Sequence, residues 1–257
     1  MTQNILITGA SSGLGEEFAR QYAAKGTKLF LTGRQPDRLK AVSEFCRSKG
    51  ADVTEQVLDV TDRDAINNWI KGIVETTHID LVIANAGISG GFSGQAIEDI
   101  TKDYKIFDVN LMGVLNTIYP ALPSMVARKS GHIVLISSLA GYVPMPSAPG
   151  YSASKVAVRF YGEALRSKLA AFNIDVTIIS PGFIKSRMTD ANNFKMPFLM
   201  ETSDAVRYMR EKIAKRAARV TFPWPMSITL KLFALLPAKI SAAIFACLPD
   251  KNSLPND

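Results

Sequence analysis

The chain contains only two cysteines and two histidines among its 257 residues. Cys46 and Cys247 give no disulfide framework, and two unpaired thiols suit a reducing compartment. His78 and His132 are too few for a metal cluster, and each flanks a predicted strand, so we interpret both as structural. These two shortages argue against a disulfide-stapled scaffold and predict that the protein binds no metal.

Targeting and linker sequences are also lacking. The opening residues, MTQNILIT, have neither the basic region nor the long apolar run of a secretory signal, which predicts a cytoplasmic protein. No Pro/Ser linker, low-complexity tract or internal repeat divides the chain. Because 47% of the residues are hydrophobic and 21% are charged, the composition is that of a soluble globular protein. We therefore expect a single domain over residues 1–257.

Short apolar runs alternate with helix-like stretches along most of the chain. The runs typical of buried strands are 4–8, 28–32, 52–60, 79–87, 131–138, 174–182 and 219–222. Helical patterns include 15–26, 37–50, 62–75 and 152–172. The alternation predicts βαβ units and hence an α/β fold, a Rossmann-type doubly wound parallel sheet of about seven strands with helices on both faces.

A glycine-rich turn follows the first predicted strand. The sequence TGASSGLG, residues 8–15, places Gly9, Gly13 and Gly15 between a strand and a helix. Glycine lets the backbone approach a ligand where a Cβ would collide, and the start of a helix offers unpaired N–H groups to a phosphate. The position of the turn in the first βα unit favours a dinucleotide site over a tight turn that binds no ligand.

The end of the second predicted strand bears on the choice of cofactor. NAD-binding sheets of this kind carry an acidic residue there, which hydrogen-bonds the ribose hydroxyls. This chain has Gly33 and Arg34 instead. A guanidinium would pair with a 2′-phosphate, so the sequence favours NADP and leaves NAD open. The alternative is that Arg34 is a solvated charge at the start of a helix.

Two further predicted strands end in residues that suit a nucleotide. Asp59 ends the third strand, where its carboxylate is placed to accept a hydrogen bond from an adenine amino group. Asn85, Ala86 and Gly87 end the fourth, and their small size would let the backbone lie against the adenosine ribose. These residues lie at the carboxyl ends of strands, which is where open α/β sheets bind their ligands.

The sequence YSASK, residues 151–155, places a tyrosine and a lysine on one face of a predicted helix. A phenol with a pKa near 10 is a poor acid–base group at neutral pH, but a nearby ammonium lowers that pKa. Ser138, at the end of the fifth strand, is placed to bind the same substrate oxygen. Asn110 lies in a long helical stretch among apolar neighbours, where its amide needs a partner such as a water or a backbone group.

Together these motifs resemble the short-chain dehydrogenase/reductase family, in whose order and spacing they occur from residue 4 to about residue 222. The resemblance implies that Tyr151 is the catalytic acid–base and that Lys155 lowers its pKa and binds the nicotinamide ribose. It also implies that Ser138 orients the carbonyl or alcohol and that Asn110 holds a proton-relay water. The cofactor contacts that it implies are Gly9, Ser11, Ser12, Gly13, Leu14, Gly15, Arg34, Asp59, Val60, Asn85, Ala86, Gly87, Tyr151, Lys155, Pro181, Gly182, Ile184 and Ser186.

Three positions depart from the family pattern. Ala84 precedes NAG where many relatives carry an asparagine, and Ser186 replaces a threonine but keeps the hydroxyl. Ser12 stands where some NADP-using members have a basic residue. The prediction of NADP therefore depends on Arg34 alone.

The predicted function is an NADP-dependent oxidoreductase that transfers a hydride between nicotinamide and a carbonyl or secondary alcohol. One alternative is a non-catalytic, nucleotide-sensing protein on the same fold, which would be expected to have lost Tyr151 or Lys155. A membrane-surface binding protein is another alternative, and it is compatible with a working enzyme core. The family also implies a homodimer or homotetramer, in which long helices around 103–129 and 152–172 pack against their copies.

The weakly patterned stretch 186–203 is predicted to be a lid over the substrate. The residues expected to face the substrate are Met145, Met188, Met196, Phe198, Leu199 and Met200. Flexible methionines and aromatic side chains favour a small-molecule substrate of apolar or lipid-like character. The alternative is that these side chains simply pack in the core.

Basic residues are concentrated in the C-terminal part of the chain, where residues 205–219 carry six Lys/Arg and one Glu. The segment 223–257 is an apolar and basic extension, and Lys231, Lys239 and Pro237 within it argue against a membrane span. Two interpretations remain. Two short helices broken at Pro237 cover the pocket or a subunit interface, or an apolar face beside the basic cluster contacts the inner surface of an anionic membrane. No aromatic and basic interleaving supports a nucleic-acid site.

Overall fold

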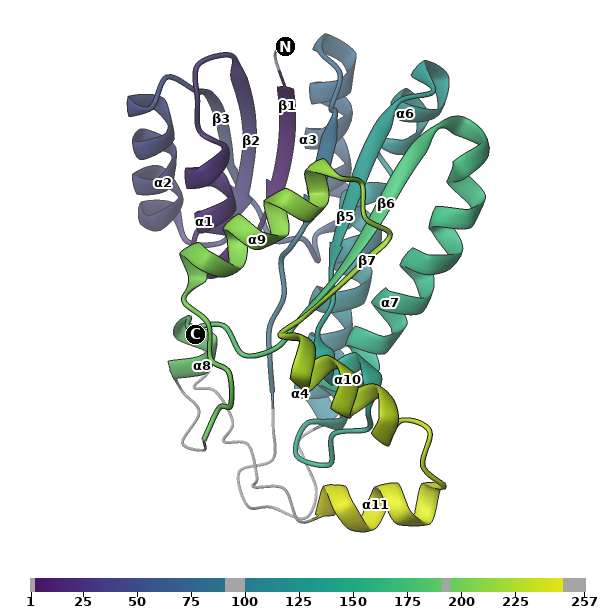
Figure 1. Ribbon diagram of the computed structural model, residues 1–257. Coiled ribbons are helices and arrows are strands. Elements are labelled where there is room, and N and C mark those ends of the chain that lie inside the picture. The colour runs from purple at the N-terminus through teal and green to yellow at the C-terminus, as the bar shows by residue number, and fades with distance from the viewer. Residues whose placement is uncertain (1–2, 91–99, 191–194, 247–257) are drawn as a thin grey trace.

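The computed structural model describes residues 3–90, 100–190 and 195–246. Its centre is one parallel sheet with the strand order β3–β2–β1–β4–β5–β6–β7 (Figure 1). The predicted doubly wound sheet of seven strands is confirmed, and every predicted strand lies in it. The strands are β1 (Gln3–Thr8), β2 (Thr27–Gly33), β3 (Asp52–Val57), β4 (Leu81–Ala84), β5 (Gly131–Ile136), β6 (Ile174–Pro181) and β7 (Arg219–Phe222).

Helices cover both faces of the sheet (Figure 1). On one face lie α1 (Gly13–Tyr22), α2 (Pro36–Ser48) and α9 (Thr202–Ala214), and on the other lie α3 (Arg63–Thr76), α5 (Gly113–Ile118), α6 (Leu122–Arg128) and α7 (Pro149–Leu169). Successive side chains of β1 pack against opposite helical layers, because side chains alternate between the two faces of a strand. Ile5 and Ile7 pack with the first layer, and Leu6 packs with the second.

The long helical stretch expected around residues 103–129 runs without interruption from Ile100 to Ile118 and resumes as α6 after residues 119–121. It consists of α4 (Ile100–Phe107), a π-helical turn (Asp108–Met112), α5 and α6. In the π-turn the N–H of Gly113 bonds to the carbonyl of Asp108, one residue further back than in an α-helix. Pro123 opens α6, where its missing N–H costs nothing. The π-turn carries Asn110.

The sheet reverses its direction of winding at β1. From β1 the chain adds β2 and β3 on one side, and then β4 to β7 on the other. A crevice forms at such a switch point, outside the carboxyl ends of the strands, and ligands of open α/β sheets bind there. This end of the sheet points downward in Figure 1, toward α8 (Arg187–Asp190), α10 (Trp224–Phe233) and α11 (Ala238–Ala246). The last two helices lie on either side of Pro237.

Of the few cysteines and histidines in the chain, Cys46 and His132 lie in the protein interior. Cys46 is a free, buried thiol in α2, and burial raises its pKa to about 11. Cys247 lies outside the described residues. His132 is buried in β5, and its Nε2 lies 2.8 Å from the Thr177 hydroxyl oxygen. Because that hydroxyl donates its own proton to the Ala217 carbonyl, the Nε2 of His132 must be the donor.

We predict that His132 makes the fold sensitive to mild acid. Burial, reinforced by the nearby Arg216, lowers the pKa of His132 from 6.5 to about 4. Between these values the unfolded chain takes up a proton that the folded chain does not, so stability falls as the pH drops through this window. The loss attributable to this side chain is at most about 3 kcal/mol.

Urea unfolding at neutral pH and near pH 4.5 measures the effect. His132→Gln keeps a donor toward Thr177 and should flatten the pH dependence, whereas His78→Gln, at an exposed histidine, should leave it unchanged. An unchanged slope in His132→Gln would show that other groups control acid unfolding.

Candidate active site

A cavity of about 540 Å³ opens at the carboxyl edge of the sheet. Of all the residues predicted to be catalytic or to bind cofactor, only Gly15 and Asn110 do not line it. The predicted residues that it brings together are Gly9, Ser11, Ser12, Gly13, Leu14, Arg34, Asp59, Val60, Asn85, Ala86, Gly87, Ser138, Tyr151, Lys155, Pro181, Gly182, Ile184 and Ser186.

The glycine-rich turn forms one wall of the cavity. Gly9 and Gly13 have φ angles of +67° and +57°, a conformation that other residues adopt only with strain. A Cβ on Gly9 would lie 2.9 Å from the Cα of Ala86, and one on Gly15 would lie 2.2 Å from the carbonyl oxygen of Gly9. Gly15 therefore serves the close packing of α1 against the turn, whereas Gly9 and Gly13 border the cavity.

Asn85 connects the ends of β4 and β1. Its side-chain amide donates to the Thr8 carbonyl at 3.0 Å, and its backbone N–H donates to the Thr8 hydroxyl at 3.2 Å. Ala86 donates to the same hydroxyl at 3.3 Å. Thr8, which is 1% exposed, was missed by the sequence analysis, although it opens the TGASSGLG motif. These bonds hold together the two strand ends that flank the switch point.

Two arginines lie just after β2, one following the strand and one in α2, and a carboxylate lies beside the first. Arg34 and Arg38 both line the cavity. The Nη1 of Arg34 lies 3.8 Å from a carboxylate oxygen of Asp59, while the other oxygen of Asp59 accepts from the N–H and hydroxyl of Thr61 at 2.9 Å. No carboxylate follows β2 in the sequence, but the structure brings Asp59 from the end of β3 to the side of Arg34. Arg38 was missed, although it lies one helical turn after Arg34.

Tyr151, Lys155 and Ser138 meet at the other end of the cavity. Lys155 is 5% exposed, and its ammonium donates to the Ile136 carbonyl at 3.1 Å. The ammonium lies 5.7 Å from the centre of the Tyr151 ring, and the Tyr151 side chain is hydrogen-bonded to that of Ser138. Ser137 donates to the Lys155 carbonyl at 2.8 Å, which fastens α7 to the end of β5.

Burial dominates the pKa values of the tyrosine and lysine. It raises the pKa of Tyr151 above its ordinary value, and the hydrogen bond with Ser138 lowers it by less. It also lowers the pKa of Lys155 to about 8. For Tyr151, the cost of removing a charge from water outweighs the stabilisation that the Ser138 hydrogen bond gives the phenolate. The lowering of this pKa by Lys155, which the family resemblance implies, stays a prediction.

Asn110 is fully buried beneath the cavity rather than in its wall. Its amide oxygen accepts from the Ile88 N–H at 2.8 Å, and its amide nitrogen donates to the Ile88 carbonyl at 2.9 Å and to the Ser154 hydroxyl at 3.0 Å. A backbone partner was one of the two expected. Ser154 was missed, although it directly precedes Lys155. The side chain of Asn110 thus joins the segment after β4 to α7.

The apolar wall comes partly from residues that the sequence analysis did not select. Of the six residues expected to face the substrate, Met145 and Met188 line the cavity. Phe198 and Leu199 are instead 55% and 44% exposed. Met196 and Met200 are not among the lining residues either, and Met200 packs against the core. The additional apolar lining includes Phe183, Pro197, Met226, Leu230, Phe233 and Ile244.

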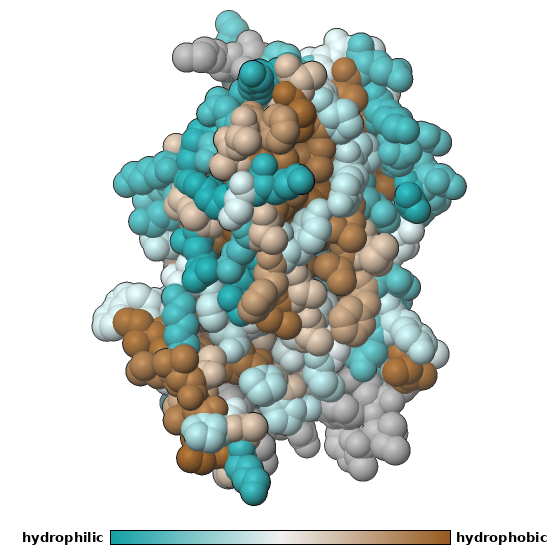
Figure 2. All heavy atoms as spheres, turned by 90° about the vertical axis from the view of Figure 1, so that its right-hand side faces the viewer, coloured by the Kyte–Doolittle hydropathy of each residue, from teal (hydrophilic) through white to brown (hydrophobic). Residues whose placement is uncertain are grey.

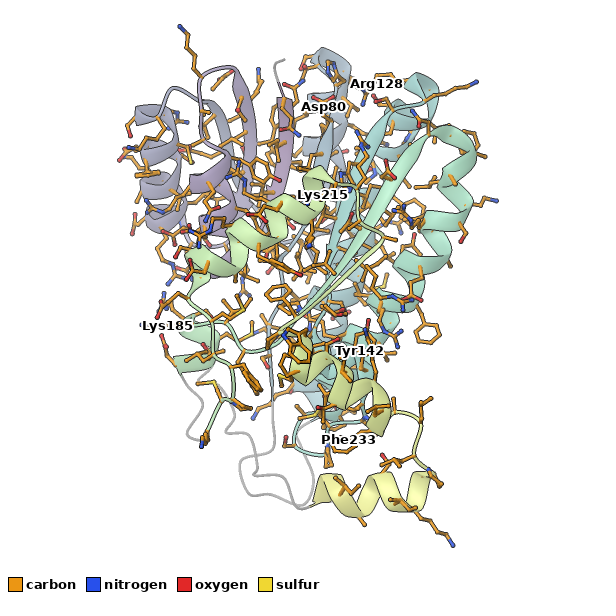
Figure 3. All side chains as sticks on the ribbon, viewed as in Figure 1. Asp80, Arg128, Tyr142, Lys185, Lys215 and Phe233 are labelled. Atoms are coloured by element: carbon orange, nitrogen blue, oxygen red, sulfur yellow. The ribbon has the colours of Figure 1, made fainter. Side chains whose placement is uncertain are left out.

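The C-terminal extension reaches the cavity through α10 and α11, as one of its two interpretations expects. The basic cluster 205–219 lies elsewhere, because Lys215 precedes β7 and Phe233 follows that strand at its other end (Figure 3). Several of its charges have partners: Arg216 lies 2.7 Å from Asp175, and Arg219 lies 2.8 Å from Glu163. The second interpretation placed an apolar face of segment 223–257 directly beside this cluster, and the structure does not show that arrangement. Among the described helices, none has both the length and the apolarity to cross a bilayer.

Known proteins with the same pattern support these observations. A family model described as short chain dehydrogenase matches residues 3–196. An uncharacterized oxidoreductase from Myxococcus xanthus is 40% identical over 90% of this chain and 92% of its own length. A dehydrogenase/reductase SDR family member 7B from Xenopus tropicalis is 34% identical over 84% of this chain and 72% of its own.

A solved structure agrees with them. It is a 3-oxoacyl-[acyl-carrier protein] reductase with bound NAD from Brucella melitensis, which is 25% identical. The match covers 85% of this chain and 88% of that one, with a TM-score of 0.74. The family model, the relatives and the fold lead to one conclusion, which confirms the resemblance seen in the motifs: this chain belongs to the short-chain dehydrogenase family of oxidoreductases.

Proposed function

We propose that this protein is an NADP-dependent oxidoreductase that interconverts a carbonyl and a secondary alcohol on an apolar small molecule. The observation that carries the proposal is the convergence on one cavity of a glycine turn, two arginines and a hydrogen-bonded serine–tyrosine pair above a buried lysine. The alternative of a non-catalytic nucleotide sensor would not require this second group of residues.

The chain's residues fit a dinucleotide phosphate. The positive φ angles of Gly9 and Gly13 keep side chains away from the start of α1, where N–H groups and the helix dipole attract phosphate. The Nε of Arg38 is shielded from water and has no hydrogen-bond partner among the described residues. We assign Arg34 and Arg38 to the 2′-phosphate, since a guanidinium pairs with phosphate through two parallel bonds. Asp59 then orients Arg34.

The bound nicotinamide supplies or accepts the hydride, and the protein provides position and proton transfer. Tyr151 donates its proton to the substrate oxygen during reduction and recovers one during oxidation, while Ser138 holds the same oxygen. The raised pKa of Tyr151 keeps the phenol protonated at neutral pH, as a donor requires. The Lys155 ammonium stabilises the phenolate that forms when the proton leaves. Asn110 and Ser154 act as positioning residues for α7.

The substrate end of the cavity is apolar. Met145, Met188, Met226, Leu230 and Phe233 offer flexible or aromatic surface and no charge. This wall supports a substrate with an alkyl or acyl portion, in keeping with the name of the solved 3-oxoacyl-[acyl-carrier protein] reductase. The lid over 186–203 stays a prediction, supported by the lining contacts of Met188 and Pro197 within it. A cytoplasmic location also stays a prediction.

The homo-oligomer is part of the proposal. Large apolar side chains are exposed along α4, α5 and α7, where the family packs its copies. Tyr104 is 64% exposed, Tyr119 57% and Phe160 61%. Side chains of this kind rarely gather on the surface of a monomer.

We predict that Tyr151→Phe lowers turnover at least about 100-fold, because the general acid is lost while the ring remains. NADPH oxidation with a panel of aliphatic, aromatic, steroid-like and sugar ketones measures the rate, and nucleotide fluorescence measures the affinity. Affinity for NADPH should be nearly unchanged. Tyr104→Phe, at an exposed tyrosine, is the control. Normal turnover in Tyr151→Phe would remove the catalytic assignment.

For the cofactor we predict a preference for NADPH over NADH of at least about tenfold. Losing one charge-assisted contact costs about 1.5–3 kcal/mol, so Arg34→Ala should erase most of the preference and Arg38→Ala a comparable part. The ratio of kcat/KM for the two cofactors is the measurement, and Lys40→Ala on the exposed side of α2 is the control. If the ratio is the same in all three variants, neither arginine binds the phosphate.

We predict that light scattering at micromolar concentration gives a mass of at least two chains of 28.0 kDa each. The double variant Tyr104→Glu/Phe160→Glu should dissociate the oligomer, because charges would be buried at the interface. Thr76→Glu, at an exposed site on α3, should leave the mass unchanged. A monomeric wild-type protein would reject the oligomer.

A further inference from the structure

Helix α10 has two apolar sides, and the cavity uses only one. Met226, Leu230 and Phe233 follow one another at helical spacing and line the cavity. Trp224 and Leu232, on the opposite side, are 72% and 59% exposed. An apolar side of a helix normally packs against another surface. Although α10 also carries the polar residues Ser227, Thr229 and Lys231, its exposed apolar side is therefore a candidate binding surface.

This exposed side is part of a larger surface, the α10–α11 patch. Its members share large apolar side chains that are at least half exposed, and they are Trp224, Ile228, Leu232, Leu235 and Ile240. Figure 2 shows hydrophobic atoms gathered at the lower end of this face of the molecule, where the two helices lie. Contiguous apolar patches of this kind mark binding surfaces.

Charge in the surrounding sequence indicates which partner fits. Between Arg219 and Asp250 the chain has no acidic residue and two basic ones, Lys231 and Lys239. Lys239 is exposed beside Ile240. A second copy related by a two-fold axis would place the patch against itself, with lysines facing each other and no carboxylate of the stretch to pair them. An anionic lipid surface supplies both the negative charge for Lys239 and an apolar layer for the patch.

The residue at the start of the patch also suits a lipid boundary. Tryptophan is enriched where membrane meets water, because one end of its ring system is apolar and the other donates a hydrogen bond. Trp224 opens α10 and is the most exposed of the large apolar side chains of that helix.

We propose that the α10–α11 patch docks this protein on the surface of an anionic lipid bilayer. The apolar side chains of the patch enter the boundary between headgroups and acyl chains, and Lys239 lies at the phosphate level. Because the opposite side of α10 lines the cavity, docking brings the apolar end of the active site to the lipid. Docking is measured without turnover, so it stands or falls independently of the proposed reaction.

The two tryptophans of the chain make a direct test possible. Trp69 lies on α3, so Trp69→Phe leaves Trp224 as the only reporter. Phosphatidylserine-containing vesicles should shift its emission to shorter wavelength, and brominated acyl chains should quench it. Pure phosphatidylcholine vesicles should bind more weakly, and high salt should weaken binding to the anionic ones. No spectral change with anionic vesicles at low salt would overturn the proposal.

Surface variants identify the part that binds. Leu235 is 81% exposed, so Leu235→Glu is compatible with folding and should lower vesicle partitioning at least about tenfold. Lys239→Gln should lower it about fivefold on anionic vesicles only. Thr76→Glu and Lys71→Gln, which change charge equally on α3, are the controls and should bind as the wild type does.

The same variants separate a lipid surface from a second copy. If Leu235→Glu lowers the mass in light scattering and leaves vesicle binding unchanged, the patch is a subunit interface and the proposal is wrong. Wild-type partitioning in Leu235→Glu at an unchanged mass would also overturn it. A circular dichroism spectrum like that of the wild type confirms that each variant is folded.

Discussion

Lys155 carries its charge in a place almost closed to water, and the candidate site is built around that charge. Burying an ammonium is costly unless hydrogen bonds replace its hydration. The Ile136 carbonyl supplies one such bond at 3.1 Å. The chain then closes around the lysine with very little spare room. A Cβ on Gly87 would lie 3.3 Å from its ammonium, and one on Gly141 would lie 2.8 Å from its backbone carbon.

The same constraint explains why elements distant in sequence are tied to α7. Ser137, directly after β5, donates to the carbonyl of Lys155, and Asn110 in the π-turn donates to the hydroxyl of Ser154, which precedes Lys155. These buried polar contacts satisfy one another, so the helix cannot shift without leaving several groups unpaired. Tyr151, one turn earlier on α7, is thereby held at a set distance from the lysine and within reach of Ser138. The geometry of the pair is a property of three elements rather than of one helix.

Sequence reasoning succeeded where the physics is local or repetitive. Alternating apolar runs defined the sheet, and the spacing of YSASK placed Tyr151 and Lys155 on one helix face. It failed where spatial neighbours decide. Nothing in the sequence around Arg34 shows that Asp59 from another strand lies beside it, and the direction of the Tyr151 pKa depends on burial. The exposure of Phe198 and Leu199 likewise depends on the path of the chain in three dimensions, which their sequence pattern does not show.

The C-terminal extension shows how one helix can serve a cavity and a surface together. Because α10 follows β7 directly, its first turn lies at the carboxyl edge of the sheet, where the substrate end of the cavity also lies. A helix with Met226 and Leu230 on one side and Ile228 and Leu232 on the other presents hydrophobic surface in both directions. The polar residues of α10 are Ser227, Thr229 and Lys231, and they lie between its two apolar sides. The apolar lining of the cavity and the proposed docking surface therefore depend on one helix with two apolar sides.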